Sequence, residues 1–284
     1  MAAAAVLWGT TGVVVRLVQA CAGLSAAAIG CYRLGSAALV LSLVRPAILG
    51  RAARALRRRP WPLVVSGTGL GAYQALYFLG VQEAGVGIAT LVSLGVAPVV
   101  APAVAAARRR RCPSAGSLGV LVAALVGLVL VSLPALGSGG QGSVALGVLA
   151  SVGSGLGYAF TVLLNRRVTA DVDPLTLTAL TGAIGAAVLL PVALAEGPVV
   201  VTGWAAGAGL LYLGAVCTAL AYGLFYGGLR TTAGDVAVVV TLLEPLTATL
   251  LAVILLGEPM TVPTAVGSLL MLGSIVVLSL LPRR

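Results

Sequence analysis

Residues 235–252 read DVAVVVTLLEPLTATLLA, and a similar stretch, GIATLVSLGVAPVVAPAVA, occupies residues 87–105. Both stretches are apolar over most of their length, and each approaches the ~20 residues that an α-helix needs to cross a bilayer. Each carries a proline near its middle, and Pro98 and Pro245 are 147 residues apart. The sequence therefore indicates two related halves, each with a membrane span of the same kind.

A second pair of stretches repeats at almost the same offset, because WGTTGVVVR at residues 8–16 is similar to YAFTVLLNR at residues 158–166. Apolar runs and the breakers between them predict helical spans at 2–20, 24–46, 62–82, 85–107, 115–134, 144–165, 174–195, 204–227, 233–256 and 262–281. The matched spans are the first with the sixth and the fourth with the ninth, so matched helices cross the membrane in opposite directions. We therefore predict an all-α integral membrane protein of ten transmembrane helices in two inverted five-helix repeats, residues 1–136 and 137–284.

The composition supports a membrane protein and argues against other classes. Of the 284 residues, 60% are hydrophobic and 8% are charged, and the mean hydropathy is +1.14. Soluble domains are about 45–50% apolar and about 25% charged, so the surplus apolar surface must face lipid. A net charge of +10 could suggest nucleic-acid binding, but a chain this apolar has no soluble basic face, and we expect no nucleic-acid partner.

The positive charges indicate the orientation in the membrane. All 17 basic residues are arginines, and 15 of them lie on one side of the predicted spans, with Arg16 and Arg33 inside spans. Cytoplasmic loops carry the excess of positive charge in membrane proteins. We therefore predict a multi-pass protein of the cell membrane with both termini in the cytoplasm.

Two ionisable residues are predicted to lie deep in the membrane. Glu244 is about 11 residues into its span, or ~17 Å deep at ~1.5 Å per residue, and Arg33 is ~14 Å deep by the same rise. Ionisable residues at such depth are costly and mark functional sites by default. Glu244 could bind a cation or carry a proton, and Arg33 could hold a substrate carboxylate. The alternative is that both are structural, either paired with each other or with exposed backbone groups.

Prolines and aromatic side chains complete the predicted site. Pro98 and Pro245 each remove a backbone donor, and freed carbonyls at membrane depth are tolerated where they face protein or a water-lined cavity. Trp8, Tyr77 and Tyr158 stand inside spans and could line a solute pathway, with ordinary packing as the alternative. Tyr73 and Tyr222 are placed inside spans in the same way.

The chain resembles the EamA-type members of the drug/metabolite transporter superfamily. The similar pieces are LWGTTGVV at residues 7–14, Tyr32-Arg33, the mid-span Pro98 and LLEPLTATLLAVILLGEP at residues 242–259. The resemblance implies ten helices in two repeats, alternating access and, often, export of amino acids, metabolites or drugs. This chain departs from symmetry at one point, because Ala97 precedes Pro98 where Glu244 precedes Pro245.

These observations favour a secondary transporter for a small solute over two alternatives, a channel or structural membrane subunit and a membrane-embedded enzyme. The chain has no GxxxxGK[ST] motif and no lysine, so it lacks the usual signature of an ATP-binding loop. It has no histidine, and its four cysteines form no CxxC pair, so we predict neither a metal nor a cofactor. The predicted partners are a small-molecule substrate, the lipid bilayer and protons as a coupling ion, with the protein a monomer or a homodimer.

Overall fold

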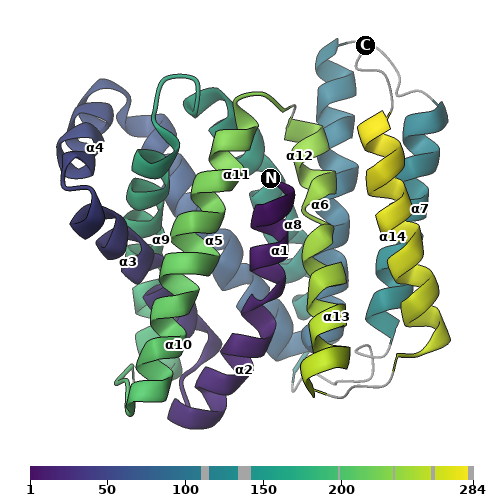
Figure 1. Cartoon of the computed structure of the whole chain (residues 1–284), viewed down its shortest axis with the longest axis horizontal. Helices are drawn as coiled ribbons and strands as arrows, with labels where there is room; N and C mark the ends of the chain where they lie inside the picture. The colour runs from purple at the N-terminus through teal and green to yellow at the C-terminus, as the bar shows by residue number, and fades with distance from the viewer. Residues whose placement is uncertain (110–114, 134–141, 198, 233, 257–259, 281–284) are drawn as a thin grey trace.

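A computed structural model describes residues 1–109, 115–133, 142–197, 199–232, 234–256 and 260–280. These residues form a bundle of helices (Figure 1) and contain no β-strand. The elements are α1 (Ala2–Gly9), α2 (Thr11–Ala22), α3 (Ala26–Val44), α4 (Ala47–Arg58), α5 (Pro60–Ala84), α6 (Val86–Arg109), α7 (Ala115–Ser132), α8 (Val144–Val168), α9 (Pro174–Glu196), α10 (Trp204–Gly214), the π-helical segment Ala215–Leu220, α11 (Ala221–Leu229), α12 (Gly234–Val240), α13 (Leu243–Leu256) and α14 (Val262–Leu280).

Six segments of this bundle are long and apolar enough to cross a membrane: Ala2–Ala22, Ala26–Val44, Val144–Val168, Pro174–Glu196, Trp204–Leu229 and Val236–Leu255. Shorter apolar helices cover Val86–Ala101, Leu118–Ser132 and Val262–Ser274. The 25-residue α5 is also long enough, although Gln74 and its tyrosines make it less apolar. The chain is therefore a multi-pass α-helical membrane protein. The expected boundary between the two halves, at 136 and 137, lies outside the described residues.

The helices depart from the predicted spans in two ways. Three spans are interrupted: the first at Thr10, the eighth by the π-helical segment Ala215–Leu220, and the ninth at Thr241 and Leu242. The second difference is α4, a helix over residues that the sequence analysis assigned to a connecting loop. Alanine, leucine and arginine are among the strongest helix formers, and they make up most of α4.

Glycines let α5 and α9 approach closely at the centre of the bundle. A side-chain carbon built on Gly67 would lie 2.6 Å from Ile184 Cβ, and one built on Gly71 would lie 2.7 Å from the Gly185 carbonyl oxygen. Small residues at helix crossings bring backbones together where lipid supplies no hydrophobic driving force. The main core cluster lies beside this crossing and includes Leu34, Leu70, Tyr222, Phe225 and Tyr226.

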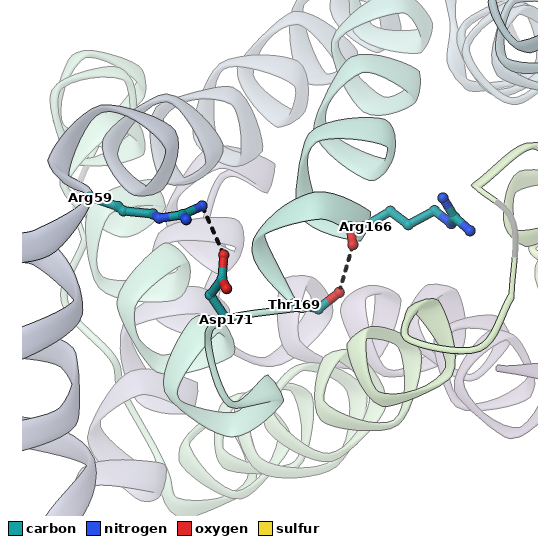
Figure 2. A network of polar contacts seen from close by, with 4 residues as sticks. All are labelled: Arg59, Arg166, Thr169 and Asp171. Carbon is teal, nitrogen blue, oxygen red and sulfur yellow. Dashed lines mark hydrogen bonds and ion pairs between the residues drawn. The ribbon is translucent and has the colours of Figure 1, made fainter.

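Several arginines gather at one end of the bundle. Figure 2 shows Arg59, at the start of α5, meeting Asp171 in the turn between α8 and α9, with an N–O distance of 2.8 Å. Arg166 Nε donates to the Thr232 carbonyl oxygen at 3.0 Å, and Arg230 Nε donates to that of Thr169 at 3.0 Å. Met1 and the last turn of α14 point toward this same end (Figure 1). Its assignment to the cytoplasm stays a prediction.

Candidate functional site

The break between α12 and α13 places Glu244 at the start of a helix inside the membrane. α12 ends at Val240, α13 begins at Leu243, and the Glu244 amide donates to the Thr241 carbonyl oxygen at 2.9 Å. A carboxylate in the first turn of a helix is favoured by the free N–H groups and the helix dipole. Pro245 is also in this first turn, where its missing N–H leaves no helical hydrogen bond unmade. The discontinuity therefore precedes the proline.

Helix α1 rests directly on this first turn. A carbon built on Gly9 would lie 2.8 Å from the Glu244 carbonyl oxygen and 2.5 Å from Thr247 Cβ. Only glycine fits so close to another backbone, so Gly9 sets the separation of α1 from α13. One residue further, the Thr10 hydroxyl donates to the Leu7 carbonyl oxygen at 2.7 Å, and α1 ends. The interruptions of the first and ninth predicted spans are therefore neighbours in the bundle.

Arg33 on α3 reaches the interior without an acidic partner in contact. Its Nη2 donates to Gln74 Oε1 on α5 at 2.5 Å, while its buried Nε has no hydrogen-bond partner. Arg33 and Glu244, both described in the structure, form no ion pair within 4.0 Å. The Arg33 charge still acts on Glu244 and on Tyr222 across the interior. The two residues thus influence each other electrostatically without direct contact.

Aromatic side chains from four helices join into a row beside these charges. Trp8 on α1 packs on Tyr222 of α11 with ring centroids 4.9 Å apart. The Tyr222 and Tyr73 hydroxyls are 2.8 Å apart and hydrogen-bonded, and the Tyr73 ring meets that of Tyr158 on α8 edge-on at 5.5 Å. The Tyr158 hydroxyl is buried and makes no hydrogen bond of normal geometry, but it lies near the Thr241 side chain at the break before α13. The row of aromatic side chains therefore ends beside the break that precedes Glu244.

Glu244 connects the row of aromatic side chains to the charged pair. Its carboxylate is within electrostatic range of the Tyr77, Tyr158 and Tyr222 hydroxyls as well as of Arg33. The Tyr77 hydroxyl is hydrogen-bonded to the Thr90 hydroxyl of α6 at 2.8 Å. The structure therefore brings together five residues named from the sequence, Glu244, Arg33, Trp8, Tyr77 and Tyr158. We call them, together with Tyr73, Gln74 and Tyr222, the interior cluster.

The two prolines differ in the structure. Pro98 is buried within α6, which continues as a helix from Val86 to Arg109, and no discontinuity accompanies it. Pro245 follows a break. The sequence predicted a disturbed helix at each proline, but only the helix of Pro245 is interrupted. Pro98 makes no hydrogen bond to the site.

The sequence analysis missed Gln74 as the partner of Arg33, and it placed Tyr73 and Tyr222 inside spans without selecting them for the site. The signal for Gln74 was available, since an amide side chain about 12 residues into the predicted span 62–82 is as unusual as a deep charge. The tyrosines gave no such signal, because only tertiary packing decides which aromatic residues meet. Within the described residues, no three His, Cys, Asp or Glu side chains gather closely enough to hold a metal ion.

Fold and interior define a multi-pass membrane protein with opposite charges among aromatic residues, an arrangement suited to a transporter. Residues 1–133 and 145–280 match the EamA-like transporter family, and the chain belongs to that family.

Individual proteins agree with this assignment. YwfM of Bacillus subtilis, named an uncharacterized transporter, is 32% identical over 99% of this chain and 93% of its own length. YicL of Salmonella typhimurium, named an uncharacterized inner membrane transporter, is 26% identical over 99% of this chain and 94% of its own. A protein of known crystal structure shares the fold with a TM-score of 0.80 at 21% identity, over 98% of this chain and 94% of that one.

Proposed function

We propose that the protein is a secondary transporter that exports a small zwitterionic solute, such as an amino acid, from the cytoplasm by alternating access. The observation that carries this proposal is the interior cluster, in which Arg33 and Glu244 share one environment without touching. A zwitterion could bridge them, with its carboxylate on the free Arg33 Nε and its ammonium group at Glu244. Arginine suits carboxylates, and aromatic faces attract ammonium groups.

The packing of the helices supports the two inverted repeats, residues 1–136 and 137–284. By their predicted spans, α3 corresponds to α9 and α7 to α14, and each of these helices packs along its counterpart. α6 packs on α8, and the corresponding α13 packs on α1. A twofold axis in the membrane plane would produce this exchange of partners, which is the symmetry of inverted-repeat transporters. Two similar halves can then rock about a central site and open it to either side in turn.

Protons are the proposed coupling ion, because a carboxylate within the membrane can carry a proton when the solute is absent. In proteoliposomes, a pH gradient should then drive accumulation of the solute. If the solute accumulates only by exchange and does not respond to the pH gradient, the proposal of a carrier stands and the proposal of proton coupling is wrong.

The proposal is tested by counterflow. Purified protein is reconstituted in liposomes preloaded with one unlabelled amino acid at a time, and uptake of the same labelled compound is measured. We expect transient accumulation that saturates with concentration for at least one amino acid. Flux that rises linearly without saturation would point to a channel. No exchange of any amino acid would exclude this substrate class and redirect the screen to drugs and other metabolites.

The Tyr158 hydroxyl provides a sharper prediction. Because the Tyr158 hydroxyl makes no hydrogen bond of normal geometry within the protein, Tyr158→Phe should cost little stability, whereas the loss of one hydrogen bond to solute should raise the half-saturation concentration by roughly 2- to 10-fold. The measurement combines saturation of counterflow with the melting temperature.

Tyr226→Phe is the matched control. The Tyr226 hydroxyl accepts from Asn165 Nδ2 at 3.1 Å, so its removal should lower the melting temperature and leave the half-saturation concentration unchanged. A destabilised Tyr158→Phe protein with unchanged half-saturation would assign Tyr158 to packing.

A further inference from the structure

We propose that a pocket between α4 and the start of α9 binds the phosphate group of an anionic phospholipid. The pocket has a volume of about 590 Å³. Its charged lining consists of Arg51, Arg54, Arg58, Arg59, Asp171 and Asp173. We call it the basic pocket. It is distinct from the interior cluster, because it lies at the end of the bundle where Arg59 meets Asp171 (Figure 2).

Helix α4 is built to present arginines to this pocket. Arg51, Arg54 and Arg58 are spaced so that they share one face of the helix, and all three are exposed. Ile48 is buried at the start of the helix, and Leu49 lies on the side away from the arginines. A short helix with one basic and one apolar face is typical of segments that lie in the membrane interface. The preference of arginine for the cytoplasmic side explains which end of the bundle is basic, but not the collection of three arginines over one pocket.

The carboxylates of the basic pocket are already engaged. Asp171 pairs with Arg59 at 2.8 Å, and Asp173 caps α9 by accepting from the Thr176 amide at 3.2 Å. Within the described part of the chain, Arg51 and Arg58 form no hydrogen bond or ion pair, and Arg54 bonds to the Gly50 carbonyl oxygen of its own helix. Three guanidinium groups therefore remain available, and their planar donors match the oxygens of a phosphate.

The surroundings of the basic pocket favour a lipid over a free anion. Trp61, the second residue of α5, is 76% exposed, as expected for an indole ring among lipid headgroups. Leu43 and Val44, at the end of α3, are exposed as well and continue the lipid-facing surface up to α4. A lipid whose chains lie along this surface would place its headgroup phosphate at the level of the arginines. The predicted cytoplasmic side is also where anionic lipids attract basic segments.

Occupation of the basic pocket would connect the two halves of the protein. α4 belongs to the first half, whereas Asp171, Asp173 and α9 belong to the second. A phosphate held between them would add to the Arg59–Asp171 contact, so anionic lipid should stabilise the folded protein.

The test measures lipid binding to the full chain in neutral detergent micelles. Phosphatidylglycerol is titrated while retained lipid is counted by native mass spectrometry and the melting temperature is followed, with phosphatidylcholine as the uncharged comparison. We expect wild type to retain phosphatidylglycerol and melt at a higher temperature. The variant Arg51→Gln/Arg54→Gln/Arg58→Gln should bind it on the order of 100-fold more weakly. Because these side chains have no acidic partner in the described structure, the lipid-free variant should melt as wild type does.

A matched variant, Arg45→Gln/Arg57→Gln/Arg167→Gln, removes the same charge from exposed positions outside the basic pocket and should retain the lipid. Equal loss of binding in both triple variants would overturn the proposal in favour of general surface attraction. No retention by wild type would overturn it as well. Inorganic phosphate that displaces phosphatidylglycerol and raises the melting temperature equally would assign the basic pocket to a free anion and overturn the lipid assignment.

Discussion

Glu244→Gln is expected to lower the initial rate of counterflow by about 10- to 100-fold, the largest loss of activity we predict. Hydrogen bonds to charged groups are worth about 1.5–3 kcal/mol, and the neutral amide would lose this contribution to an ammonium group. It would also leave the Arg33 charge without a balancing charge in the interior, since Glu244 is the carboxylate on which Arg33 acts. The measurement is the initial rate of labelled uptake at equal amounts of folded, monodisperse protein.

Two further variants separate binding from folding. Glu244→Asp keeps the charge on a shorter side chain and should retain part of the activity. Glu196→Gln makes the same chemical change at an exposed position at the end of α9 and should transport as wild type does. If the Glu244→Gln protein folds and transports at the wild-type rate, Glu244 is a structural residue. The proposed substrate site at Glu244 and the proposed proton coupling would then both be wrong.

Gly71→Val should produce the largest loss of stability. The first added carbon would meet the Gly185 carbonyl oxygen at 2.7 Å and Val188 Cβ at 2.8 Å. A side chain can rotate away, but a backbone oxygen within a helix cannot, so α5 and α9 must separate. Overpacking of this kind costs about 1–3 kcal/mol, and sometimes more. At roughly 2–4 °C per kcal/mol, the melting temperature in detergent should fall by several degrees.

Gly273→Val is the control for the intrinsic effect of valine in a helix. Gly273 lies inside α14, is exposed, and a carbon built on it would meet nothing within 4 Å. Its substitution should leave the melting temperature near that of wild type. If the two variants have the same melting temperature, α5 and α9 do not pack as closely at Gly71 as the structure shows, and the packing role proposed for Gly71 is wrong.

The interior cluster was partly predictable because depth in a membrane can be counted along a helix. Glu244 and Arg33 were identified by their distance from the ends of their spans, and the structure places both in one electrostatic environment. Their direct pairing, which the sequence left open as one alternative, depends on side-chain position, and depth does not determine that position. In the structure Arg33 bonds to Gln74 instead.

Helix interruptions were less accessible to sequence reasoning. Pro98 and Pro245 look alike in the sequence, yet α6 continues past Pro98 and a break precedes Pro245. Close glycine contacts do not account for the difference, because Gly9 packs against the first turn of α13 and Gly155 of α8 packs as closely against Ser93 of α6. The π-helical segment Ala215–Leu220 contains no proline, so the sequence contains no signal for it. There, the Thr218 hydroxyl donates to the Leu213 carbonyl oxygen at 2.8 Å, five residues back along the chain.

By itself, the sequence determined that this chain is a helical membrane protein and which residues carry charge into the membrane. Both follow from local physics: apolar runs must face lipid, and each run must satisfy its own backbone hydrogen bonds by forming a helix. Only the tertiary structure decided which residues meet. The row from Trp8 through Tyr222 and Tyr73 to Tyr158 depends on the close approach of four helices that are distant in sequence. In lipid, such an approach is set by side-chain shape and small residues at the crossings, which hydropathy does not encode.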